Sequence, residues 1–412
     1  STTTVNLNGG TIIGDAYGGG LGQTGDDAVE AKVYGDVTVY QLGTILVPAY
    51  DADSLATSGR IFGCNNVNGT PKGHVLVYVS NTTPNNPDDK YAISAVYGGG
   101  NKAEYTPVRI AQDDSDKTEV VIDGCNIVTI HSVYGGGNAA STPATKVTIS
   151  GAKEIMYVFG GGNGAGAGNP GANVGYHYYS EDEFGGTTPE AIARRRDAQN
   201  NLAYGSGIAS TNIYGGNIHK VFGGSNTRGN IRQASVAMLD ELSTCPLVLN
   251  GIHGGGREAY MEGKTILEMG CTTGMPAIYG GSENADVGSD ITLTLTSGHF
   301  DKVFGGNNKG GRILGSITVN IEQTGCLPIT IDELYLGSNN APYSVFGYKD
   351  TYQDVIINGE TIRQYDLIDS ADVKLFNDPV LHLRSFESIG KVFGGGNGEH
   401  AIMVGDPTVE IN

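Results

Sequence analysis

Short runs of alternating apolar and polar residues recur along the chain, and they predict half-buried β-strands. The clearest run is Asp290 to Thr296, in which isoleucine and leucine alternate with threonine. Similar runs cover residues 120–122, 147–150 and 317–321.

A glycine-rich string follows many of these runs. Its full form, Val-(Tyr or Phe)-Gly-Gly-Gly-Asn, begins at Val96, Val133, Val158 and Val392, and looser copies begin near residues 16, 61, 213, 221, 252, 278, 303 and 345. The step from Tyr134 to Phe159 is 25 residues, and longer steps contain polar inserts. A recurring string at a fixed step indicates a stacked repeat with a unit of about 25 residues.

Each unit has room for three short extended segments and three corners, as residues 285–287, 290–296 and 299–304 illustrate. This organisation predicts an all-β fold, a right-handed parallel β-helix (solenoid) of about a dozen coils with loop insertions. Kelch-type propeller blades also place two glycines after an apolar–aromatic pair. Their repeat is about 50 residues long, and this chain has no tryptophan.

The corner residues have a structural interpretation. Glycine accepts positive φ, and asparagine tolerates the left-handed conformation better than other side chains. Asparagines at the same corner of successive coils would also hydrogen-bond one another. We expect such a ladder to contain Asn101, Asn138, Asn163, Asn226, Asn307 and Asn397. The aromatic residue before the glycines is expected to stack in the core or against adjacent coils rather than to bind a sugar.

Residues 1–412 are expected to form a single β-helix domain with two interruptions. The insertion 165–206 contains a short helix signal, with Thr188 as N-cap and Pro189 at the first helical position. Residues 343–385 form an irregular region. The chain starts at Ser1 without an initiator methionine and ends in what looks like the first strand of another unit, so we expect it to be part of a longer protein.

Composition excludes some classes of protein. The net charge of −19 argues against a nucleic-acid partner, and no apolar run is long enough for a transmembrane segment. Glycine accounts for 65 of the 412 residues. The five cysteines are far apart and form no CxxC pair, so we interpret them as small buried apolar residues: Cys64, Cys125, Cys245, Cys271 and Cys326.

The sequence predicts no catalytic set, but one neighbourhood suits a carbohydrate-active enzyme. Glu258 and Glu283 are 25 residues apart, so one repeat would bring both carboxylates to one face, as a hydrolase requires. Arg257 lies beside them and is the kind of base that a polysaccharide lyase would use. The simpler interpretation is a solvated polar stripe along the coils.

Candidate binding residues lie after two corners and in the large insertion: Arg228, Lys309, Tyr178, Tyr179 and Arg195. Binding residues often concentrate on loops held by a rigid scaffold. No metal site and no cofactor are predicted. The acidic inserts near residues 26, 88 and 113 would bind calcium weakly at most, because none has the spacing of a dedicated calcium loop.

The glycine-rich corners and the strand alternation resemble those of Gly-rich-repeat parallel β-helix proteins of the bacterial cell surface, which include adhesin-like domains. The resemblance covers nearly the whole chain outside the inserts. It implies an extracellular or cell-surface, non-catalytic module that binds a glycan or a host or surface protein. Two alternatives remain open: a carbohydrate-active β-helix enzyme (polysaccharide lyase or hydrolase) and a structural stalk.

Overall fold

The described part of the chain is all β. The computed structural model describes residues 2–52, 54–108, 117–165, 171–176, 205–238 and 245–412, and every regular element within them is a strand. These residues contain no helix, and therefore none that is long and apolar enough to cross a membrane. The helix expected after Thr188 lies outside the described residues.

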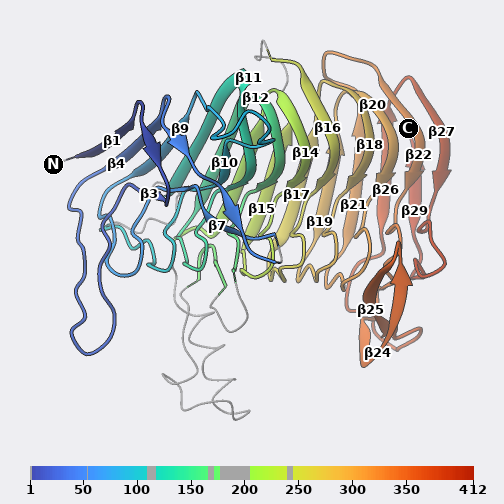
Figure 1. Ribbon diagram of the computed structural model, residues 1–412. Coiled ribbons are helices and arrows are strands. Elements are labelled where there is room, and N and C mark those ends of the chain that lie inside the picture. The colour runs from blue at the N-terminus through green and yellow to red at the C-terminus, as the bar shows by residue number, and fades with distance from the viewer. Residues whose placement is uncertain (1, 53, 109–116, 166–170, 177–204, 239–244) are drawn as a thin grey trace.

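Within the described residues, twenty-one strands form one long sheet, in which all pairings are parallel and fall into two rows (Figure 1). The first row contains β1 (Thr3–Leu7), β4 (Val37–Gln41), β9 (Val75–Val79), β11 (Thr118–Tyr134), β12 (Thr145–Phe159), β13 (Ile208–Ile213), β15 (Gln233–Met238), β17 (Lys264–Met269), β19 (Ile291–Leu295), β21 (Ile317–Glu322), β26 (Val380–Ser385) and β29 (Thr408–Ile411). The second row contains the later halves of β11 and β12 together with β3 (Ala16–Tyr17), β8 (Arg60–Phe62), β10 (Ile93–Tyr97), β14 (Gly216–Phe222), β16 (Leu247–His253), β18 (Thr272–Tyr279), β20 (Gly298–Phe304), β22 (Ile329–Tyr335) and β27 (Ser388–Phe393).

The chain visits the two rows in turn, so each repeat unit adds one strand to each row. A third segment joins the units more loosely, and Val287 illustrates it with single bridges to Met261 and Ile313. An all-parallel sheet of this kind also differs from the antiparallel blades of a propeller.

In the part of the chain that the structure describes, four pairs of strands lie outside this sheet. Two are parallel: β2 (Thr11–Ile12) with β5 (Ile45–Leu46), and β23 (Tyr343–Ser344) with β28 (Met403–Val404). Two are antiparallel hairpins: β6 (Ala49–Tyr50) with β7 (Ala56–Ser58), and β24 (Tyr348–Ile357) with β25 (Glu360–Leu367). The β24–β25 hairpin lies within the region 343–385 and projects beside the stacked strands (Figure 1), whereas β26 at the end of that region belongs to the sheet.

Alternation along the strands determines which side chains enter the core. In β19 the residues Ile291, Leu293 and Leu295 are fully buried, while the threonines between them are half-buried. Inward-facing residues of both rows join one apolar cluster that extends through the stacked units. The strand predicted from residues 290–296 therefore forms because its apolar face covers this core.

One aromatic ring per unit forms a continuous stack outside that core. Neighbouring ring centroids are 4.6 to 5.1 Å apart and the ring planes differ by 4° to 12°. This spacing is close to the distance between paired strands. The stack contains Tyr17, Phe62, Tyr97, Tyr134, Phe159, Phe222, His253, Tyr279, Phe304, Tyr335 and Phe393.

An asparagine ladder runs beside the aromatic stack. Each amide donates to the side-chain oxygen of the previous unit at 2.8 to 2.9 Å, through Asn66, Asn101, Asn138, Asn163 and Asn226. A second stretch joins Asn308, Asn339 and Asn397 at 2.9 to 3.0 Å.

The expected place of Asn307 in this ladder is wrong. Its amide nitrogen donates to backbone carbonyls, including that of Ala285, and its oxygen accepts the N–H of Ser282. The ladder position is four residues after the aromatic ring, and after Phe304 that position is Asn308.

The corner glycines serve close packing rather than positive φ. In the corners that follow a stacked ring, neither the glycines nor the ladder asparagines are among the residues with positive φ, contrary to the sequence expectation. Gly216 and Gly347, in the looser copies near residues 213 and 345, do have positive φ. A Cβ on Gly98 would overlap the carbonyl oxygen of Gly135, and a Cβ on Gly135 would overlap that of Gly160. Glycine is therefore required because the backbones of successive corners approach too closely for a side chain.

The interpretation of the cysteines as small buried apolar residues is wrong for Cys125 and Cys326, which are not buried, whereas Cys245 and Cys271 are buried but form disulfides. Cys125 pairs with Cys245 and Cys271 with Cys326, whereas Cys64 is buried as a free thiol. Sequence spacing gave no signal, since the paired residues are 120 and 55 positions apart. All four paired cysteines lie where the chain passes from the first row to the second. Cys125 is in the middle of β11, and the other three lie in connections between a first-row strand and a second-row strand.

Replacement of His253 by phenylalanine should reduce the loss of stability in acid. Burial lowers the pKa of His253 to about 3, whereas an unfolded histidine titrates near 6.5. The unfolded state therefore binds more protons between these values, so the folded state loses stability as the pH falls from 6.5 towards 3. At pH 5 this effect lowers the free energy of unfolding by about 2 kcal/mol.

Urea unfolding at pH 7.5 and pH 5 measures the effect, and it should be smaller in His253→Phe than in the wild type. The charged groups near His253, namely Glu283, Lys220 and Lys309, stay in both proteins. His400→Phe changes a half-exposed histidine and serves as control. An unchanged pH dependence in His253→Phe would contradict the assignment.

Asn163→Ala should destabilise the protein by about 2–4 kcal/mol, because it leaves two buried partners in the ladder without their hydrogen bonds. Asn163 donates to Asn138 and accepts from Asn226, each at 2.8 Å. The control Asn397→Ala removes an exposed member of the ladder and should cost less than about 1 kcal/mol. Equal shifts in the urea midpoint would mean that burial of the ladder does not matter.

Candidate functional site

A cleft of about 340 Å³ lies over the second-row strands β10, β11 and β12. The β6–β7 hairpin borders it, and the turns after β14 and β16 close one end. The residues that line it are Ser54, Leu55, Ala56, Ala95, Tyr97, His131, Ser132, Tyr134, Met156, Tyr157, Asn226 and Arg257. The described inserts and the regular units therefore meet at this cleft.

Three tyrosines surround the imidazole of His131. Tyr50, Tyr91 and Tyr157 lie edge-on to it, with ring centroids 5.3, 5.3 and 5.6 Å away. Tyr157 is part of β12, whereas Tyr50 and Tyr91 belong to inserts that lengthen two earlier units. Burial and the positive charges of Arg257 and Lys90 lower the pKa of His131 to about 4, so the ring is neutral at pH 7.

Arg257 forms the charged end of the cleft. Its guanidinium carbon lies 5.3 Å from the ring centroid of Tyr157, a cation–π arrangement. Its Nε lies 3.7 Å from Oε2 of Glu283. The side chain therefore spans from the aromatic cluster to a neighbouring ionic cluster.

Arg257 and Glu283 occupy the two positions at which the asparagine ladder is interrupted. Both follow the stacked ring of their unit by four residues, as the ladder asparagines do. Asn226 precedes the interruption, and its Oδ1 is buried with no hydrogen-bond partner in the described part of the chain. The Oδ1 of Asn226 is thus a buried acceptor without a described partner, at the end of the cleft that Arg257 occupies.

Glu283 is only 4% exposed and lies among cations. Its Oε1 is 2.8 Å from the Nζ of Lys220 and 3.6 Å from that of Lys309. Burial opposes ionisation of the carboxyl, but His253 and these lysines outweigh it and lower the pKa of Glu283 to about 2. The carboxylate therefore stays ionised and holds the surrounding cations together.

The expected pairing of Glu258 with Glu283 across one face is wrong. The step from His253 to Tyr279 is 26 residues, so a spacing of 25 shifts the register by one residue. Glu283 donates its backbone N–H to Gly256, the residue before Arg257, and Glu258 instead lines another pocket, next to the β24–β25 hairpin. The two carboxylates therefore do not form a facing pair.

The two binding candidates that lie within the described residues, Lys309 and Arg228, do not line the cleft. Lys309 bonds Glu360 of the β24–β25 hairpin at 2.6 Å in addition to its contact with Glu283. Arg228 is exposed, and its backbone pairs with residues of the neighbouring unit. The other three lie outside the described residues: Tyr178, Tyr179 and Arg195.

Sequence reasoning missed His131 and the tyrosines around it. A signal was present at Tyr157, which stands two residues before a stacked ring, where the preceding units have Ala95 and Ser132. Tyr157 thus replaces the small residues of the two preceding units, whereas the next unit has Lys220 at this position, and its ring lines the cleft. Tyr50 and Tyr91 had no such signal, because the sequence of an insert does not show how the insert folds back over the strands.

Glu283→Gln should destabilise the protein by about 3–5 kcal/mol, because it leaves Lys220 and the neighbouring cations without their buried counter-charge. Glu360→Gln is the matched control, since Glu360 bonds Lys309 from an exposed position, and its loss should cost about 1 kcal/mol or less. Urea midpoints at pH 7.5 measure both. A cost for Glu283→Gln no larger than the control would show that the cluster contributes little.

Comparisons with protein-family models, with curated proteins and with solved structures find no match to this chain. The function is therefore argued from the cleft itself.

Proposed function

We propose that the chain is a glycan-binding module of the cell surface, built on a right-handed parallel β-helix. The two rows of parallel strands, visited in turn by the chain, support a solenoid. Parallel strands joined by a crossover connection are right-handed in nearly all known cases, which supports the handedness.

The observation that carries the binding proposal is the aromatic cleft with Arg257 at its end. Sugars present apolar ring faces that pack on aromatic side chains, and their hydroxyl groups need donors and acceptors. Tyr157 offers a half-buried ring beside the guanidinium of Arg257. Arg257 suits an acidic substituent, because its guanidinium is partly exposed and can form paired hydrogen bonds with a carboxylate or sulfate.

The ordered inserts favour a binding module over a plain stalk. Tyr50 and Tyr91 both come from inserts and both contact His131. A stalk has no need of loops that converge on one place, whereas recognition sites are commonly built from loops on a rigid scaffold.

An extracellular or cell-surface location is part of the proposal. It rests on the resemblance of the glycine-rich repeats to adhesin-like surface proteins and on the two disulfides, which persist in oxidising compartments. The proposed partner is a glycan, and a host or surface protein is the alternative that the same resemblance implies.

Binding of a panel of acidic and neutral polysaccharides, with and without calcium, tests the proposal. We expect an acidic glycan to bind, and Tyr157→Ala to weaken this binding by about tenfold or more, because the ring and its cation–π contact with Arg257 are lost. Arg257→Lys should weaken acidic glycans more than neutral ones.

Tyr352→Ala is the matched control. Tyr352 also carries an arginine over its ring, with Arg363 at 3.9 Å, but it belongs to the distant β24–β25 hairpin. Equal losses in Tyr157→Ala and Tyr352→Ala, or no binding by any polysaccharide, would contradict the proposal. New reducing or unsaturated ends in the same reactions would instead favour the carbohydrate-active enzyme.

A further inference from the structure

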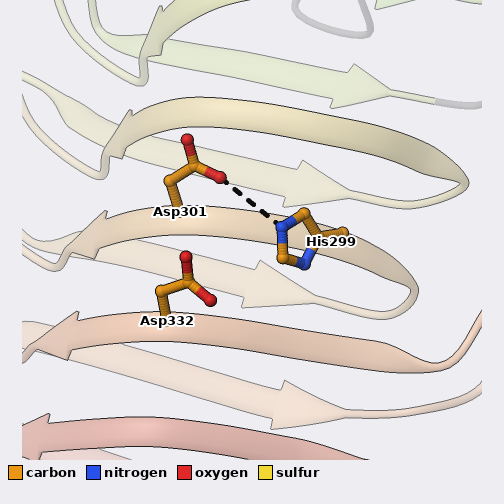
Figure 2. Close-up of side chains that lie close together, drawn as sticks. All are labelled: His299, Asp301 and Asp332. Atoms are coloured by element: carbon orange, nitrogen blue, oxygen red, sulfur yellow. Dashed lines mark ion pairs between the residues drawn. The ribbon is translucent and has the colours of Figure 1, made fainter.

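A histidine and two aspartates gather on the outer surface of the second row, several units away from the cleft (Figure 2). His299 and Asp301 belong to β20, and Asp332 belongs to the neighbouring strand β22. One potential ligand atom from each lies within 4.8 Å of the others.

The sheet register explains why the three side chains meet. β20 and β22 pair in parallel with Lys302 opposite Glu333, so Asp301 stands beside Asp332. His299 precedes Asp301 by two residues and therefore projects from the same face of the strand. The cluster is fixed by backbone pairing and does not depend on a loop.

Two aspartates side by side on neighbouring strands repel each other. In the described part of the chain, Asp332 makes no ion pair, and Asp301 has only His299 at 3.5 Å. The adjacent lysine, Lys302, bonds Glu333 instead, at 3.2 Å. The protein therefore leaves a local negative charge that a bound cation would offset.

The hydrogen bond of His299 suits a metal ligand. Its Nδ1 lies 2.6 Å from the hydroxyl oxygen of Thr330, while its Nε2 faces Asp301. With the proton on Nδ1 donated to Thr330, Nε2 presents its lone pair to the aspartates. Histidine ligands of metals are commonly held by such a bond from the second ring nitrogen.

We propose that His299, Asp301 and Asp332 bind a divalent transition metal, with Zn²⁺ as the best fit, and that water completes the coordination. Tetrahedral Zn²⁺ with bonds near 2.1 Å holds its ligand atoms about 3.4 Å apart, and Nε2 of His299 is 3.5 Å from Oδ1 of Asp301. The imidazole disfavours Ca²⁺ and Mg²⁺, which prefer oxygen ligands.

Calorimetric titration of the tag-free, chelator-treated protein with Zn²⁺ tests the site. We expect one site in the wild type and at least a tenfold loss of affinity in His299→Ala and in Asp332→Asn. Thr330→Val should weaken binding about tenfold, since the bond that orients the imidazole is lost. Zn²⁺ should also raise the thermal midpoint of the wild type but not that of Asp332→Asn.

His382→Ala is the matched control, because His382 pairs with a single carboxylate, Glu410, at 2.8 Å. It should bind Zn²⁺ as the wild type does. Wild-type affinity in His299→Ala or in Asp332→Asn would overturn the site, and so would an equal loss in His382→Ala. Each variant changes an exposed or half-exposed side chain, and its unfolding midpoint without metal establishes that it folds.

Discussion

The in-register stacking of one unit on the next is the constraint on which the rest of this structure depends. Parallel pairing sets successive strands at the spacing of a β-sheet, so every residue has an equivalent directly above and below it. Rings then stack on rings, amides bond amides, and the first glycine of each corner faces the carbonyl of the next. A side chain is favourable here when it interacts well with copies of itself, which is why the chain reuses tyrosine, phenylalanine, asparagine and glycine at fixed places.

The residues that interrupt the aromatic stack and the asparagine ladder lie at or beside the cleft. His253 replaces a benzene ring in the stack, and four residues later Arg257 replaces an asparagine in the ladder. Glu283 replaces the next asparagine, and its carboxylate compensates the charge of Arg257 and of nearby lysines. An unpaired charge at a buried position of the ladder would destabilise the fold, so the arginine and the glutamate occur together. Tyr157 is a further departure, because its ring stands where the two preceding units have Ala95 and Ser132, and it lines the cleft.

The sequence predicted the repeat well because strand alternation and the glycine-rich corner are local signals. Residues 290–296 and 299–304 became β19 and β20 almost without change. The register between units was harder to predict, since it depends on the length of every step. One extra residue between His253 and Tyr279 places Glu258 and Glu283 out of register. Asn307 and Asn308 are adjacent, so the sequence did not show that Asn308 is the one that enters the ladder. The disulfides and the tyrosines of the inserts could not be predicted, because their partners are determined by how loops fold back over other units.

Several lengthened units occur where the cleft forms, and this suggests how a regular scaffold gains a specific site. Steps of 45, 35 and 37 residues lead from Tyr17 through Phe62 and Tyr97 to Tyr134, whereas the step from Tyr134 to Phe159 is only 25. The extra residues in the longer units leave the stack intact, since the rings still meet at 4.7 to 4.8 Å. Insertion is therefore tolerated at the corners and can place rings such as Tyr50 and Tyr91 over the second row. The outer face of the first row is more uniform in β19 and β21. Its half-buried residues there are threonine, asparagine and glutamate, with no aromatic ring. The second row carries both the cleft and the His299 cluster, so it is the face on which recognition would be built.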